Sequence, residues 1–308
     1  MAWTAADIAD LSGKGAIVTG ASNGLGLIAA GELARRGAKV VFAVRDVGKG
    51  EAAAARVRSA APKAEIVVSR LDLSDLSSVR DFAGRIPEVF PHGVDILMNN
   101  AGVMALPRRV SPDGYELQFA TNHLGHFALT GLLMPSLLLR RSPRVVTVSS
   151  NLHTRGRIDF NDLNGNRRYT PYGAYSQSKL ANLLFTYELQ RRAAATSLLS
   201  LAAHPGYAST GLQEAGPRMT GSAWQAAVVR AVNSVMAQRP EMGALPQLYA
   251  ATAPGVPRAG YFGPDGRAGM RGYPTLVESS PASHDEAVAR RLWDESEQMT
   301  GVRYSFAG

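Results

Sequence analysis

Short β-branched runs alternate with longer stretches of helical periodicity over the first 200 residues of the chain. Such alternation is typical of a parallel sheet with helices on both faces. The pattern predicts six strands, at 16–19, 39–44, 65–69, 95–99, 144–149 and 197–203. It predicts a helix after the first strand that ends at about 36. Further helices are predicted at 47–59, about 113–139 and about 173–192. Ser74 is the expected N-cap of the helix after the third strand.

Beyond residue 206 the periodicity weakens, but 260–263 reads as a seventh strand and 286–297 as a closing helix. No linker, repeat or low-complexity tract interrupts the chain. We therefore expect one α/β domain over 1–308, with a single Rossmann-type doubly wound parallel β-sheet of about seven strands.

Composition narrows the class of protein. The net charge of +8 comes mostly from arginines scattered in ones and twos, which favours a solvated surface over a nucleic-acid site. The absence of cysteine excludes disulfides and thiolate catalysis. The first ten residues lack the basic and apolar regions of a signal peptide, and 127–139 is too short to span a bilayer. We expect a soluble, cytoplasmic protein with no membrane span.

Two local motifs carry chemistry. Thr19-Gly-Ala-Ser-Asn-Gly-Leu-Gly26 follows the first strand and opens a helix, where glycines and free N–H groups suit a pyrophosphate. Tyr175 and Lys179 are four residues apart, so on a helix the phenol and the ammonium share one face. A neighbouring cation favours the phenolate, which predicts a lowered pKa for Tyr175.

Together with Asn99-Asn-Ala-Gly102, Asn122, Ser149-Ser150 and Pro205-Gly206, these motifs resemble the short-chain dehydrogenase/reductase family over about residues 13–210. The stretches Arg45-Asp46 and Tyr175-Ser-Gln-Ser-Lys-Leu-Ala-Asn182 are most similar to its retinol dehydrogenase-like branch. The resemblance implies an oxidoreductase that interconverts a carbonyl and an alcohol by hydride transfer. It also implies that 1–210 forms the cofactor-binding and catalytic core, and 211–308 the substrate-loop region and the completion of the sheet.

The resemblance implies four catalytic residues. Tyr175 would be the general acid or base, Lys179 would lower its pKa and bind the nicotinamide ribose, and Ser150 would hold the substrate oxygen. Asn122 would hold a water that links Lys179 to solvent. Cofactor contacts are implied for Tyr175, Lys179 and for Gly20, Ser22, Asn23, Gly24, Leu25, Gly26, Arg45, Asp72, Leu73, Asn99, Ala101, Gly102, Pro205, Gly206 and Thr210.

The end of the second strand decides the cofactor. A carboxylate there would accept bonds from the ribose of NAD, whereas a guanidinium suits the 2′-phosphate of NADP. The acidic position aligns with Val44 and is followed by Arg45, so NADP(H) is favoured. Asp46 keeps NAD(H) open, because a shift of one residue would place it on the ribose.

Several other features have plainer interpretations. His123 and His126 are spaced like metal ligands, but no third ligand is evident, and we expect no metal site. The stretch 159–165 resembles a calcium loop yet has Leu163 at a ligand position. His153 follows Ser150 closely, but no Gly-x-Ser-x-Gly elbow frames that serine, and His204 is expected to be structural.

More residues separate Ser150 from Tyr175 than the family commonly shows, and the surplus, within 151–170, predicts a loop beside the active site. In the family the helix that follows packs on a partner subunit, so a homodimer, a homotetramer or a monomer remains open. The expected substrate is a lipophilic aldehyde or ketone, because the predicted pocket residues are mostly apolar: Met104, Leu106, Tyr172, Tyr207, Leu212, Trp224 and Met242. A non-catalytic nucleotide-binding relative or a sugar-nucleotide epimerase would be expected to lack part of the catalytic set or to carry a different glycine motif.

Overall fold

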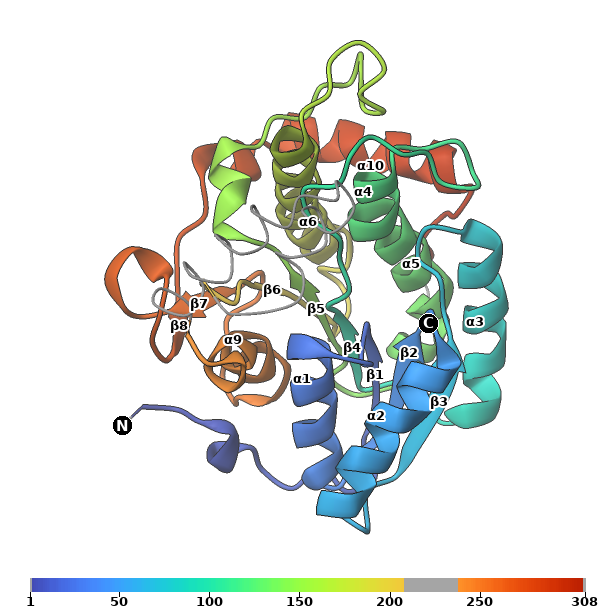
Figure 1. Ribbon diagram of the computed structural model, residues 1–308, viewed down its shortest axis with the longest axis vertical. Coiled ribbons are helices and arrows are strands. Elements are labelled where there is room, and N and C mark those ends of the chain that lie inside the picture. The colour runs from blue at the N-terminus through green and yellow to red at the C-terminus, as the bar shows by residue number, and fades with distance from the viewer. Residues whose placement is uncertain (1, 208–237, 307–308) are drawn as a thin grey trace, which may run out of the picture.

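A single eight-stranded sheet organises the computed structural model, which describes residues 2–207 and 238–306 (Figure 1). The strand order is β3-β2-β1-β4-β5-β6-β7-β8, and all pairings are parallel except that of β7 with β8. The strands are β1 (Gly15–Thr19), β2 (Lys39–Val44), β3 (Ile66–Arg70), β4 (Ile96–Asn99), β5 (Arg144–Val148), β6 (Leu199–Ala203), β7 (Tyr261–Pro264) and β8 (Pro274–Leu276). The order reverses between β1 and β4, and sheets of this kind bind ligands at the carboxyl ends of the strands beside such a reversal.

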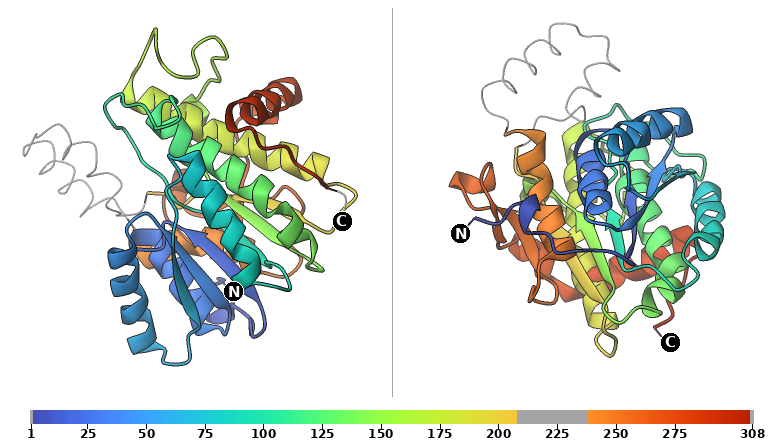
Figure 2. Two further views of the ribbon diagram at one scale, coloured as in Figure 1. Left: turned by 90° about the vertical axis from the view of Figure 1, so that its right-hand side faces the viewer. Right: turned by 90° about the horizontal axis from the view of Figure 1, so that it is seen from below.

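Helices cover both faces of the sheet, as Figure 2 shows. One layer consists of α1 (Gly24–Arg35), α2 (Val47–Ala60) and α9 (Pro240–Thr252). The other consists of α3 (Leu76–Val89), α5 (Gly125–Leu138), α6 (Pro171–Arg192) and α10 (Glu286–Thr300). Strand side chains alternate between the layers: Val18 packs toward the first and Ile17 toward the second. This confirms the predicted α/β architecture.

The structure differs from the predicted elements at three places. The eighth strand, β8, is short and antiparallel, and the sequence analysis missed it because three residues carry almost no periodicity. The N-cap of α3 is Asp75 and not Ser74, whose hydroxyl donates to Asp72. The helix expected from about 113 begins at α4 (Leu117–Phe119), where the Glu116 carboxylate accepts from two backbone N–H groups.

The closing helix α10 lies against α6 and α5. It buries Trp293, whose ring lies within 5.9 Å, centroid to centroid, of those of Phe127, Phe185 and Tyr304. This contact fixes the outer side of α6, the helix that carries Tyr175. Among the described residues, no helix is long and apolar enough to cross a membrane.

Replacing Trp293 by Ala should lower the free energy of unfolding by about 3–5 kcal/mol, because it removes a fully buried aromatic ring and leaves a cavity. Urea unfolding followed by circular dichroism measures this. Leu276→Ala is the matched control, since Leu276 is 57% exposed and its truncation should change stability by about 0.5 kcal/mol or less. Equal effects of the two substitutions would contradict the packing described for α10.

Candidate active site

Tyr175 and Lys179 lie one turn apart on the face of α6 that covers β5. Thr170 caps the helix by accepting from Gly173 N–H, and Pro171 occupies its first turn. Both catalytic candidates are nearly inaccessible, at 4% and 3% exposure. The Nζ of Lys179 donates to Val148 O at 3.0 Å and lies 5.6 Å from the centre of the Tyr175 ring.

The two serines after β5 occupy different environments. Ser150 is partly exposed, and its hydroxyl accepts from Leu152 N–H at 3.2 Å and lies near enough to the Tyr175 phenol to lower its pKa. Ser149 is buried, and its hydroxyl donates to Lys179 O at 2.8 Å. The arrangement brings Ser150 to the phenol and uses Ser149 to attach α6 to β5.

Asn122 sits in the middle of a π-helical turn, η2 (Ala120–Leu124), that joins α4 to α5. Its Nδ2 donates to Val103 O and Ser178 Oγ, and its Oδ1 accepts from Val103 N–H, all at 2.8–2.9 Å. One lone pair of Oδ1 therefore remains for a water. A Cβ on Gly102 would lie 3.2 Å from this oxygen and 3.5 Å from Lys179 Nζ, so glycine keeps the space beside both atoms open.

The pKa of Tyr175 moves opposite to the sequence prediction. Burial raises this pKa to about 12, and the neighbouring Ser150 hydroxyl opposes the rise. The same burial lowers the pKa of Lys179 to about 8. The prediction was wrong because it considered the neighbouring cation and not the loss of water from both groups. At neutral pH the phenol therefore keeps its proton.

The glycine turn before α1 fits a pyrophosphate. Gly20 and Gly24 have φ values of +70° and +54°, which residues other than glycine rarely adopt. A Cβ on Gly26 would collide with Gly20 O and Asn100 Nδ2. Within the described part of the chain, no side chain caps α1, so its first N–H groups stay free for an anion. Ser22, Asn23 and Leu25 lie on this turn and are partly or fully exposed.

At the end of β2, Arg45 and Asp46 have different surroundings. Arg45 is exposed, whereas the Asp46 carboxylate caps α2 by accepting from Lys49 N–H at 3.0 Å. After β3, the Asp72 carboxylate accepts from the backbone and hydroxyl of Ser74, and Leu73 is buried against Gly125. The site at β2 thus presents a cation toward solvent.

The segment 99–102 at the end of β4 combines buried and partly exposed residues. Ala101 and Gly102 are partly exposed just after the carboxyl end of β4. Asn99 is fully buried, and its Nδ2 donates to Thr130 and Thr147, so its side chain supports the strand ends. Asn100, which the sequence analysis missed, donates to Thr19 O and lies against Gly26. The alternation of side chains along β4 was the available signal.

Pro205 and Gly206 follow β6, as expected, and Gly206 has a φ of +64°. The Pro205 carbonyl accepts from Gln238 Nε2 at 2.8 Å. Thr210, Leu212 and Trp224 lie outside the described residues. Tyr172 is 60% exposed near the start of α6.

The residues between Ser150 and Tyr175 form a short 3-10 helix, η3 (Asn151–Arg155), and a loop that projects at the top of Figure 1. Arg108 donates to Asn164 O and Gly165 O at the far end of this loop. Tyr169 donates to Leu106 O, and the Gln118 amide donates to Tyr169 Oη and Pro171 O. These long-range bonds attach the loop to 104–118, which the sequence alone could not reveal.

The histidines have structural partners. His123 contacts Ser296 Oγ, while His126 contacts Thr19 Oγ1 and Asn122 O. Asp162, in the stretch that resembled a calcium loop, accepts from three backbone N–H groups. Within residues 2–207 and 238–306, no group of three or more His, Asp or Glu side chains could hold a metal ion.

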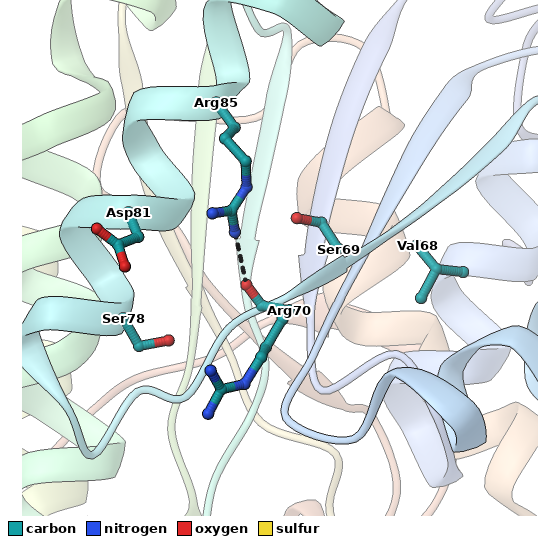
Figure 3. A pocket seen from close by; sticks show the side chains of 6 residues that line it. All are labelled: Val68, Ser69, Arg70, Ser78, Asp81 and Arg85. Atoms are coloured by element: carbon teal, nitrogen blue, oxygen red, sulfur yellow. Dashed lines mark hydrogen bonds between the residues drawn. The ribbon is translucent and has the colours of Figure 1, made fainter.

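A surface hollow lies away from Tyr175, between β3 and α3 (Figure 3). Its lining residues are Val68, Ser69, Arg70, Ser78, Asp81 and Arg85. Arg85 donates to Arg70 O at 3.2 Å across it. It contains none of the predicted catalytic or cofactor-binding residues.

Comparison with known proteins places this geometry in a family. Residues 14–220 match the family model for short chain dehydrogenases. The chain is 42% identical to human retinol dehydrogenase 13 over 300 residues, covering 96% of this chain and 86% of that protein. It is 38% identical to mouse retinol dehydrogenase 14, with 95% and 87% coverage.

Solved structures agree. A crystal structure of a putative uncharacterized protein from Mycobacterium paratuberculosis is 44% identical, with a TM-score of 0.81 and coverage of 99% of this chain and 100% of that one. A putative NAD(P)-dependent gluconate 5-dehydrogenase from Beutenbergia cavernae, with bound NADP, is 26% identical with a TM-score of 0.61, covering 79% and 91%. This chain belongs to the short chain dehydrogenase family and is an NAD(P)-dependent oxidoreductase that acts on CH–OH groups.

Proposed function

We propose that this protein interconverts a lipophilic aldehyde or ketone with its alcohol, using NADP(H) and Tyr175 as the general acid/base. The grouping of the Ser150 hydroxyl, the Tyr175 phenol and the Lys179 ammonium where α6 covers the end of β5 carries the proposal. A carbonyl oxygen between these hydroxyls would accept from both, and the two donors would stabilise the negative charge that develops on it.

The protonation state of the free protein favours reduction. Because burial raises the pKa of Tyr175 to about 12, the phenol holds a proton that it can deliver to the carbonyl oxygen at neutral pH. The nicotinamide supplies the hydride when it is bound. Lys179 beside the phenol would bind the nicotinamide ribose, and the free acceptor position of Asn122 would take the water that returns a proton.

Arg45 supports the choice of NADP(H). Its guanidinium is exposed immediately after β2, where a 2′-phosphate would lie, and Asp46 is already bonded to the α2 backbone. The NADP bound to the Beutenbergia cavernae protein agrees with this preference.

The substrate class rests on the relatives and on the site wall. The relatives named retinol dehydrogenases are named for a lipophilic alcohol, and Met104 and Tyr172 supply apolar surface here, whereas Leu106 is buried. Cytoplasmic residence and a homodimeric or homotetrameric assembly stay predictions.

Tyr175→Phe should lower kcat for aldehyde reduction by about 10²- to 10⁴-fold, because it removes the proton donor. NADPH oxidation with medium-chain, isoprenoid and sugar carbonyls measures this. Tyr172→Phe removes an exposed hydroxyl three residues away, and its kcat should stay within about twofold of the wild-type value. Undiminished reduction by Tyr175→Phe would refute the mechanism, and turnover of sugars alone would refute the lipophilic substrate.

Arg45→Ala should raise KM for NADPH by about 10- to 100-fold, since a charge-assisted hydrogen bond is lost, and should leave KM for NADH unchanged. Lys49→Ala is the control, because this exposed cation pairs with Asp46. An unchanged KM for NADPH, together with weaker NADH binding by Asp46→Ala, would assign the protein to NAD instead.

NADPH binding should weaken by about tenfold as the pH rises from about 7 to about 9.5. Over this range Lys179 loses its proton, and with it a charge-assisted hydrogen bond to the nicotinamide ribose. The pKa of Lys179 in the free protein is lowered to about 8, so its ammonium is charged below that pH and neutral above it. Fluorescence titration of NADPH measures the effect, which Lys179→Met should abolish. The same pH dependence in Lys179→Met would contradict this role.

A further inference from the structure

A buried histidine joins the catalytic serine to the C-terminal part of the chain. His153 lies in η3, three residues after Ser150, and is 2% exposed. Its Nδ1 is 2.7 Å from Ser150 O, and its Nε2 is 3.0 Å from Ser280 N.

These two partners fix the form of the imidazole. A carbonyl oxygen can only accept, so Nδ1 carries the hydrogen; a backbone N–H can only donate, so Nε2 is the bare acceptor. Burial lowers the pKa of His153, which agrees with a neutral ring. The ring packs edge-on against Tyr261, with centroids 5.7 Å apart, so its orientation is determined on three sides.

The partner segment is itself anchored to α6. Tyr187 on that helix hydrogen-bonds with Ser279 at 2.8 Å, and Ser283 bonds both Ser279 Oγ and Ser280 O at 2.6 Å. His153 therefore connects Ser150 to the segment 279–283, which is also bonded to α6 through Tyr187.

His153 does not activate Ser150 as a nucleophile. It contacts the serine carbonyl, whereas the Ser150 hydroxyl accepts from Leu152 N–H and lies near the Tyr175 phenol. We propose that His153 is a positioning residue: by holding the Ser150 carbonyl, it keeps the serine hydroxyl aimed at Tyr175 and the substrate oxygen. This role rests on the proposed carbonyl reduction.

Two substitutions separate the two bonds. In His153→Asn the shorter amide can reach the Nδ1 position and still donate to Ser150 O, but it loses Ser280. In His153→Gln the longer amide can accept from Ser280 N–H but cannot donate to Ser150 O, which then keeps only the bond from the backbone N–H of residue 153. Their kcat and KM for aldehyde reduction, their NADPH dissociation constants and their melting temperatures are compared with those of the wild type.

We expect His153→Gln to lower kcat by about 10- to 100-fold, because a serine displaced by a fraction of an ångström no longer fits the reacting oxygen. NADPH binding should be unchanged, and His153→Asn should keep kcat within about threefold of the wild type. His284→Asn is the control: this histidine bonds Ser279 but does not touch Ser150, so its loss should leave kcat unchanged.

Three results would overturn the positioning role: an equal loss of kcat in both His153 variants, a loss of kcat confined to His153→Asn, or a wild-type kcat in both variants. So would a loss that follows a lower melting temperature or weaker NADPH binding. A wild type that oxidises NADPH with none of the carbonyls would overturn the proposed function, and this role with it.

Discussion

The site depends on an ammonium and a phenol held together where almost no water reaches them. Burying a charge is costly unless strong partners satisfy it, so the Lys179 contact with Val148 O constrains both the helix and the strand. The same carbonyl accepts from Asn182, and Ser149 bonds back to Lys179 O. Helix α6 is thereby fixed to β5 at the point where Ser150 emerges.

This attachment explains how distant segments meet at one place. The parallel strands deliver the glycine turn, the 99–102 segment and Ser150 to the same edge of the sheet. The π-helical turn at Asn122 then bonds Val103 to Ser178 across that edge. Such turns interrupt the regular ladder and often occur at functional sites.

The sequence predicted what depends on local pattern and on family resemblance: the parallel core, the glycine turn and the grouping of Ser150, Tyr175 and Lys179. It failed where the outcome depends on tertiary surroundings. The pKa of Tyr175 rises because the whole fold excludes water from it. Asn99 and Asn100 differ in burial, which the motif alone did not show: Asn99 is fully buried, whereas Asn100 is partly exposed. The hydrogen bonds of Tyr169 and His153 link segments far apart in the sequence, so no local sequence pattern could predict them.

Carbonyl reduction by this site requires Tyr175 to be protonated before the cofactor binds. A pH titration of tyrosinate absorbance tests this most directly, as the difference between the wild type and Tyr175→Phe without cofactor. The account predicts no difference up to a pH of about 10, because an ordinary phenol ionises near that value and burial raises this one to about 12. A difference signal from one tyrosinate below a pH of about 9 would contradict it.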